Sequence, residues 1–279
     1  MPSPGETMVI SPPPGCATIC RPAGPLRSMR RSFCNTGYRA KIGVIVPSTN
    51  TVVEHDVNAL APHGITFHCG RMYVEDQSMG NHESFMGLQT QLRGSMSIAL
   101  RDVMTINPDL MMMGMSAPTF SGGVDGNTAF QKEVSDQVNG IPVTTGASAC
   151  RAGLEALGVK KISVFSPYQP VADEWVDRYF TEAGFDVVSV TGLRCPTATS
   201  IAEVTPKELV KVLEEIDTPE TEAIVQVGTN LSFIRMADEA ESWLGKPVVA
   251  INTATVWHTL RQAGFTDTVG GFGTLFRNF

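Results

Sequence analysis

The sequence predicts an α/β protein in which two pseudo-symmetric halves, each built on a doubly wound parallel sheet, face each other across an active cleft. Two observations predict this fold. From Lys41 onward, short apolar runs alternate with longer segments that have helical apolar spacing, which is typical of a mainly parallel sheet. In addition, residues 109–120 and 222–233 share one pattern, an apolar run followed by a small polar loop and a phenylalanine. This repeat indicates two similar halves.

Eight strands are expected. Most are short continuous apolar runs, the pattern of parallel strands that are buried on both faces of a sheet. They are residues 41–46, 66–72, 110–113, 142–144, 161–165, 186–191, 223–227 and 247–251.

Eight helices are expected between and after these strands, because the segments have the length and apolar spacing of amphipathic helices. They are residues 52–61, 82–106, 129–139, 147–157, 170–183, 206–216, 233–244 and 254–263. Several of them end at a glycine, which closes helices because it adopts the left-handed conformation readily. These glycines are Gly158, Gly184, Gly245 and Gly264.

Residues 1–39 differ in composition from the rest of the chain. They are rich in proline and arginine, contain a single acidic residue and lack the apolar periodicity of a folded segment. We expect a disordered leader, with a mis-assigned start upstream of Met29 as the alternative. The first half is predicted to span residues 40–150 and the second half residues 151–253. The C-terminal segment, residues 254–279, is expected to pack back on the first half.

Composition excludes several classes of function. The net charge of -7 and the absence of a basic run interleaved with aromatics argue against nucleic acid as a partner. No apolar stretch reaches the roughly 18 residues of a membrane span, so no membrane segment is expected. The six cysteines are scattered, which favours reduced thiols in a cytoplasmic protein. The five histidines form no metal-binding pattern, so no metal or other cofactor is implied.

Polar turns are expected at the carboxyl ends of four strands. They span residues 47–51, 114–120, 166–170 and 227–231. In α/β proteins this edge of the sheet is where ligands bind. If the two halves face each other, all four turns meet in one cleft.

Four short motifs in these turns occur in the order and spacing of a known enzyme superfamily. They are Pro-Ser-Thr-Asn-Thr at 47–51 with Glu54 behind it, Gly-Met-Ser at 114–116, Ser-Pro-Tyr at 166–168 and Gly-Thr-Asn-Leu at 228–231. The chain resembles the aspartate/glutamate racemase superfamily, in its branch of maleate cis-trans isomerases and arylmalonate decarboxylases, over about residues 41–270. The resemblance implies a cofactor-independent enzyme that holds a small carboxylate or dicarboxylate between its halves. The resemblance is also consistent with a homo-oligomer, without implying one.

Substrate contacts are implied for the hydroxyl, amide and phenol groups of these turns. The candidate substrate-binding residues are Thr49, Asn50, Ser116, Tyr168, Thr229 and Asn230. A carboxylate removed from water must recover hydrogen bonds, and such groups supply donors in a fixed array. Each also has an ordinary structural interpretation. Asn50 suits the cap of the helix from Val52, and Tyr168 suits a core aromatic.

The catalytic cysteines of the superfamily are missing. Racemases of this kind use two cysteines, one per half, as acid and base, and comparison of the two loops aligns those positions with Gly114 and Val227. Maleate isomerases need both thiols, whereas arylmalonate decarboxylases keep the second and have glycine at the first. The chain therefore resembles the decarboxylases at Gly114 and neither group at Val227.

Other residues are candidates for the acid and base. Glu54 and His55 follow the Asn50 loop by one helical turn, and His258 lies in the helix after the last strand. A histidine can replace a thiol as general base, although surface or capping roles are the alternative for both histidines. The folded part has three further cysteines, and we expect their thiols to be buried and structural, because such thiols are commoner than reactive ones. They are Cys69, Cys150 and Cys195.

Three functions are consistent with these residues. The preferred one is an isomerase or racemase-like enzyme, similar to maleate isomerase, that acts on a small carboxylate or dicarboxylate with a non-cysteine acid/base. The alternative is a decarboxylase or lyase in which desolvation and the oxyanion-binding loops do most of the chemistry. The third is an inactive carboxylate-binding protein that kept the donors and lost the thiols.

Overall fold

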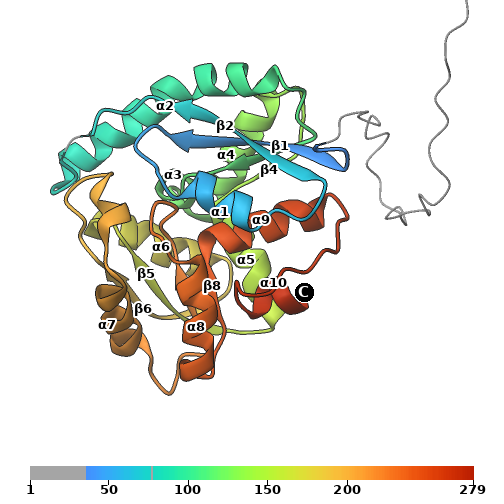
Figure 1. The fold of residues 1–279 in the computed structure, drawn as a ribbon. Helices are drawn as coiled ribbons and strands as arrows, with labels where there is room; N and C mark the ends of the chain where they lie inside the picture. Colours follow the sequence, from blue (N-terminus) through green and yellow to red (C-terminus); the bar gives the residue numbers. More distant parts are fainter. Residues whose placement is uncertain (1–35, 77) are drawn as a thin grey trace, which may run out of the picture.

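The computed structural model describes residues 36–76 and 78–279, so the predicted leader lies outside the described residues except for its last four positions. Two four-stranded parallel sheets form the centre of the two halves (Figure 1). Their strand orders are β2-β1-β3-β4 and β6-β5-β7-β8, so the second sheet repeats the topology of the first. The predicted α/β fold with two pseudo-symmetric halves is confirmed.

The first sheet is short and apolar, with β1 at its centre. Its strands are β1 (Ala40–Pro47), β2 (Ile65–Met72), β3 (Leu110–Met113) and β4 (Val143–Thr144). The helices of this part are α1 (Val53–Ala59), α2 (His82–Met104), α3 (Ala117–Phe120), α4 (Gly123–Gln137) and α5 (Gly146–Leu157). All four residues of β3 are buried, as expected for a parallel strand covered on both faces.

The second sheet has β5 at the equivalent position. Its strands are β5 (Lys161–Ser166), β6 (Asp186–Gly192), β7 (Ala223–Gln226) and β8 (Val248–Ala250). The helices are α6 (Pro170–Glu182), a 3-10 turn (Ser200–Glu203), α7 (Pro206–Ile216), α8 (Ile234–Leu244), α9 (Ile251–Gln262) and α10 (Thr274–Asn278). In both halves the central strand is followed by a polar turn and then a helix.

The eight predicted strands and eight predicted helices are all present, with differences at their ends. Helix α4 begins at Gly123 instead of residue 129, because its first turn is glycine-rich and polar and carries no apolar period. Helix α9 begins at Ile251, directly after β8, where the expected loop is absent. The short helices α3 and α10 were not predicted, since they are too brief to show a period.

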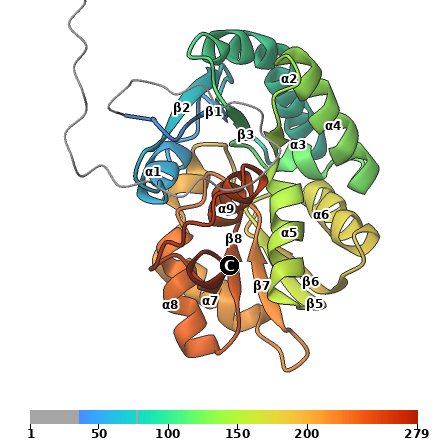
Figure 2. The same cartoon turned by 90° about the vertical axis from the view of Figure 1, so that its right-hand side faces the viewer.

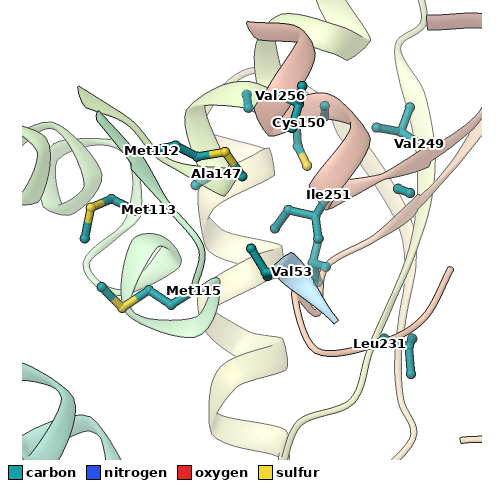
Figure 3. Close-up of a cluster of buried hydrophobic side chains, with 14 of the residues drawn as sticks. Val53, Met112, Met113, Met115, Ala147, Cys150, Leu231, Val249, Ile251 and Val256 are labelled. Carbon is teal, nitrogen blue, oxygen red and sulfur yellow. The ribbon is translucent and has the colours of Figure 1, made fainter. Parts of the chain in front are cut away.

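The hydrophobic core is continuous across the two halves. Figure 3 shows side chains of both halves packed together, among them Met112, Cys150, Ile251 and Val256. Helices α5 and α9 lie against each other at this junction. A Cβ atom on Gly146 would lie 2.5 Å from Ile251 Cδ1, so glycine permits the close approach of the two helices.

The C-terminal segment contacts both halves. Helix α9 lies beside α1 and also packs on β3 and β4 (Figures 1 and 2). Arg39 forms an ion pair of 2.6 Å with Asp267. Helix α10 packs on α9 and α5, and its start is also held by α8: the Gly273 N–H donates to Asp238 Oδ1 at 2.9 Å. The predicted boundary between residues 150 and 151 falls inside α5.

No helix within residues 36–76 and 78–279 is both long and apolar enough to cross a bilayer.

Candidate active site

A pocket of about 50 Å³ lies between the halves, at the carboxyl ends of the strands. All six predicted substrate-binding residues line it: Thr49, Asn50, Ser116, Tyr168, Thr229 and Asn230. They come from the turns that follow β1, β3, β5 and β7. The parallel strands bring them together because their carboxyl ends share one edge in each sheet.

The hydroxyl groups of Ser116 and Tyr168 join the two halves inside the pocket. They form a short hydrogen bond, and Ser116 Oγ also lies 3.2 Å from the carbonyl oxygen of Val227. Burial raises the pKa of Tyr168 to about 12, although the hydrogen bond with Ser116 opposes this shift. Tyr168 is therefore a neutral phenol at neutral pH, able to donate a proton and unsuited to accept one.

The backbone of Tyr168 is fixed by its own half. Its N–H donates to Ser166 Oγ at 3.1 Å, and its carbonyl oxygen accepts from Arg194 Nη1 at 2.7 Å. Ser166 in turn donates to Asp173 Oδ1 at 2.6 Å, and Asp173 also pairs with Arg194. The residue thus presents its hydroxyl from a rigid turn.

The Asn50 side chain can both cap α1 and face the pocket as a hydrogen-bond donor. Its Oδ1 accepts hydrogen bonds from the N–H groups of Val52 and Val53, at 3.0 and 2.9 Å, so the side chain caps α1. Its Nδ2 has no hydrogen-bond partner within the described chain, and the residue lines the pocket. The oxygen end is structural, and the amino end is a free donor.

Asn230 and Thr229 differ although they are neighbours. Both ends of the Asn230 amide are engaged: Oδ1 accepts from Thr51 N at 2.9 Å and Nδ2 donates to Ala198 O at 2.9 Å. Asn230 therefore connects the two halves. The Thr229 hydroxyl has no partner among the residues that the structure describes, and this residue offers its hydroxyl to the pocket.

The remainder of the lining is mostly apolar and comes largely from α2. The α2 residues in the pocket are Phe85, Leu88, Gln89 and Leu92, and Met79, Met115, Pro118, Ala198 and Ile201 add further apolar surface. The Phe85 ring lies 6.0 Å from that of Tyr168, measured between centroids. Sequence reasoning missed these residues, because their spacing along α2 is also the spacing of an ordinary buried helix face.

The three predicted acid/base residues do not line the pocket. Glu54 and His55 lie on the outer side of α1, whose buried positions are Val53, Asp56 and Val57, and Glu54 pairs with Arg71 at 3.2 Å. His258 lies on α9, where it stacks on Trp257 and hydrogen-bonds Gln262 at 3.0 Å. Burial lowers the pKa of His258. Helix geometry points all three side chains elsewhere.

Gly114 and Val227, the positions that the loop comparison assigns to the two cysteines, are not among the residues that line the pocket. Val227 is fully buried, and a Cβ atom on Gly114 would lie 2.5 Å from Val46 Cγ1 and 3.1 Å from Val53 Cγ1. Packing thus leaves no room for a side chain at Gly114.

The other cysteines of the described chain lie outside the pocket lining: Cys69, Cys150 and Cys195. Burial raises the pKa of Cys69 to about 12 and that of Cys195 to about 11, and raises the pKa of Cys150 further. Because only a thiolate is strongly nucleophilic, these thiols are poor nucleophiles. Within residues 36–76 and 78–279, no cluster of three or more His, Cys, Asp or Glu side chains could hold a metal ion.

Two facing halves with a polar cleft at their strand ends define a protein of the aspartate/glutamate racemase superfamily fold. Residues 42–276 match the arylmalonate decarboxylase family, and the chain belongs to that family. Its relatives are isomerases and decarboxylases, and this protein is an enzyme of one of these two kinds.

Three comparisons illustrate the relationship. A maleate isomerase of Pseudomonas putida is 26% identical over 245 residues, covering 84% of this chain and 96% of the relative. An arylmalonate decarboxylase of Bordetella bronchiseptica is 27% identical over 168 residues, covering 59% and 69%. The structure of Nocardia farcinica maleate cis-trans isomerase bound to TRIS superposes with a TM-score of 0.77 at 23% identity, covering 85% of this chain and 98% of that one, which shows the shared fold.

Proposed function

We propose that this enzyme holds a small carboxylate through neutral donors and acts on the adjacent carbon without a thiol, with decarboxylation of a substituted malonate as its reaction. One observation carries the proposal: Tyr168 is the only titratable side chain among the described residues that line the pocket. The rest of the lining consists of neutral polar groups and apolar side chains. Such a pocket suits one retained carboxylate and an apolar substituent.

The retained carboxylate would bind at the free donors. Asn50 Nδ2 and the Thr229 hydroxyl are these donors, in a pocket largely removed from water. The Tyr168 hydroxyl, which is hydrogen-bonded to Ser116 in this structure, would turn to donate to the carboxylate. A second ionised carboxylate beside Phe85 or Leu88 would lose its hydration without gaining donors. Because carbon dioxide is neutral, this desolvation favours the loss of that group.

The chemistry balances without a nucleophile. Cleavage of the bond to the departing carboxylate leaves its electron pair on the α-carbon, and the retained carboxylate delocalises that pair as an enediolate. The neutral donors stabilise the charge that develops on its oxygens. Protonation of the carbon then completes the product, with Tyr168 as the proton donor and water restoring the phenol.

Isomerisation of a small carboxylate or dicarboxylate, with a non-cysteine acid/base, is the second candidate. The observation in its favour is the extent of similarity, because the maleate isomerase of Pseudomonas putida matches 84% of this chain and the arylmalonate decarboxylase matches 59%. The predicted acid/base residues, Glu54, His55 and His258, lie outside the pocket lining. In this reaction Tyr168 would serve only as the acid, and water would have to act as the base. Binding without turnover would instead identify an inactive carboxylate-binding protein.

A comparison of two tyrosine variants tests the proposal. Tyr168→Phe removes the pocket phenol, whereas Tyr179→Phe removes a buried phenol that packs on Phe120 and Phe180 outside the pocket lining. With phenylmalonate as substrate, we expect release of carbon dioxide by the unmodified protein and by Tyr179→Phe. Loss of a preorganised donor should lower the rate of Tyr168→Phe by about 100-fold or more. Conversion of maleate without carbon dioxide release would favour the isomerase, and equal rates for both variants would contradict the role of Tyr168.

A further inference from the structure

Asp56 is a fully buried carboxyl group behind the pocket. It lies on α1, and its Oδ2 accepts a hydrogen bond of 2.8 Å from Asn252 Nδ2. Its Oδ1 has no hydrogen-bond partner within the described chain. Burial raises the pKa of Asp56 to about 6, against the opposing effects of Asn252 and His55. Neither the fold nor the proposed chemistry accounts for a carboxyl group at this position.

Asn252 connects Asp56 to the pocket. Its Nδ2 also donates to the carbonyl oxygen of Thr229 at 3.0 Å, while its Oδ1 is buried and has no partner in the described part of the chain. One amide group, at the start of α9, thus joins α1 of the first half to the turn that carries Thr229. Movement of Asn252 would move the Thr229 hydroxyl.

The two unpartnered oxygens belong to the same pair of side chains. If Asp56 is ionised, its Oδ1 and Asn252 Oδ1 are both acceptors, and each is buried without a donor. A single proton on Asp56 Oδ1 would give this pair of side chains a donor that the ionised form lacks. Buried polar groups are normally satisfied in folded proteins, so the neutral form fits this environment better.

Among the described residues, no buried cation compensates an ionised Asp56 carboxylate. Helix α1 packs on β2 and α9. The titratable groups of these two elements are His68, Cys69 and Arg71 on β2, and His258 and Arg261 on α9. Arg71 pairs with Glu54, and Arg261 donates to the carbonyl oxygens of Phe265 and Asp267. Within the described chain only exposed His55, on the same helix, acts on Asp56 through its charge.

We propose that Asp56 in its neutral form is a positioning residue: its carboxyl group holds Asn252, and Asn252 holds the Thr229 carbonyl so that the Thr229 hydroxyl faces the pocket. The inference about ligand binding rests on the proposed function. The inference about the structure of the turn does not.

The variants Asp56→Asn and Asp56→Leu of the full-length protein test the positioning role of Asp56. The asparagine keeps an acceptor for Asn252 and adds a permanent donor, whereas leucine removes both. Asp102→Asn, at an exposed carboxylate, is the matched control. Phenylacetate, a single carboxylate with an apolar substituent, is the probe, and its thermal shift is measured at about pH 5 and about pH 8.

We expect phenylacetate to stabilise the unmodified protein and the control more at the lower pH. Asp56→Asn should keep the full shift at both values, and Asp56→Leu should lose it at both. Equal shifts for the unmodified protein, Asp56→Asn and Asp56→Leu would overturn the proposal.

A second measurement needs no ligand. A carboxyl group with a raised pKa stabilises the fold below its unfolded pKa, and this contribution is lost as pH rises through the folded value. The melting temperature of the unmodified protein should therefore fall between about pH 4 and about pH 6.5 more than that of Asp56→Asn. Hydrogen exchange in residues 227–233, corrected for intrinsic rates, should be faster in Asp56→Leu than in Asp56→Asn.

Identical exchange in the two variants, or identical pH profiles of melting, would overturn the positioning role even if phenylacetate binds. The opposite result distinguishes the proposed function from the positioning role of Asp56. If phenylacetate never binds while both ligand-free differences appear, the function is wrong and the role of Asp56 in the turn stands.

Discussion

At the scale of single residues, the Ser116 and Tyr168 hydroxyls are the centre of the site. They meet across the two halves, and Ser116 also donates to the carbonyl oxygen of Val227, which the loop comparison assigns as the second cysteine position. In this protein a hydroxyl from the first half therefore contacts the backbone where a catalytic side chain would be expected from the second half. The contact fixes the orientation of Tyr168.

Ser116→Ala tests this contact. The substitution removes the partner of the Tyr168 phenol and leaves the Val227 carbonyl without its donor, which should cost about 1 to 3 kcal/mol of unfolding free energy. We expect turnover to fall by about 100-fold, as for other oxyanion-type donors, while the fold is retained. The measurements are kcat and denaturant unfolding. A variant with unchanged turnover would show that Ser116 is structural only.

Gly114→Cys tests whether the first thiol position is open. Because a Cβ atom there would lie 2.5 Å from Val46 Cγ1, we expect overpacking that destabilises the fold by about 1 to 3 kcal/mol. The added Val46→Ala substitution should recover part of that loss by making room. Denaturant unfolding of both variants measures this. A stable Gly114→Cys protein whose new thiol reacts rapidly with iodoacetamide would contradict the closed packing.

At the scale of elements, the crossing of α5 and α9 joins the halves. Gly146→Ala should push on Ile251 Cδ1 and destabilise the protein by about 1 to 3 kcal/mol. Ile251→Val removes that terminal methyl group, so the double variant should be more stable than Gly146→Ala alone. Thermal unfolding of the two single variants and the double variant measures the coupling. Strictly additive losses would show that the two residues do not press on each other.

The sequence predicted the elements well where the signal was local. Continuous apolar runs identify strands such as β3, and Pro206 with Ile216 bounds α7 as predicted. The start of α4 was missed because a glycine-rich polar turn has no period. The predicted binding turns meet in one pocket, since parallel strands share an edge.

The apolar wall and the acid/base assignment depended on tertiary contacts. Phe85 and Leu88 look like core residues in sequence, and only the approach of α2 to the second half makes them pocket residues. Glu54 and His55 follow the Asn50 turn in sequence, but the rotation of α1 directs Asp56 inward instead. Closeness to the Asn50 turn in sequence does not show which face of α1 is buried, because that depends on the elements that pack against the helix.

At the scale of the whole molecule, both halves contribute to one cleft and are tied across it. The Thr51 N–H donates to the Asn230 side chain. The backbone N–H of Thr199 donates to Asp76 Oδ1 at 3.2 Å, and the Thr199 hydroxyl donates to Asp76 Oδ2. A ligand held by Asn50 from one half and Tyr168 from the other would stabilise the entire fold. The fold of the family's solved relatives is thus kept, and a pair of hydroxyls from the two halves meets in its cleft.

The proposed function requires carboxylate chemistry in this cleft without a thiol. Carbon dioxide release from phenylmalonate, measured in deuterium oxide before and after treatment of the native protein with iodoacetamide, is the decisive measurement. We expect release of carbon dioxide, one deuterium per product molecule, and the same rate after the treatment, because the pKa values of Cys69, Cys150 and Cys195 are raised and none of the three lines the pocket. Complete loss of activity on alkylation, or no release of carbon dioxide at all, would contradict it.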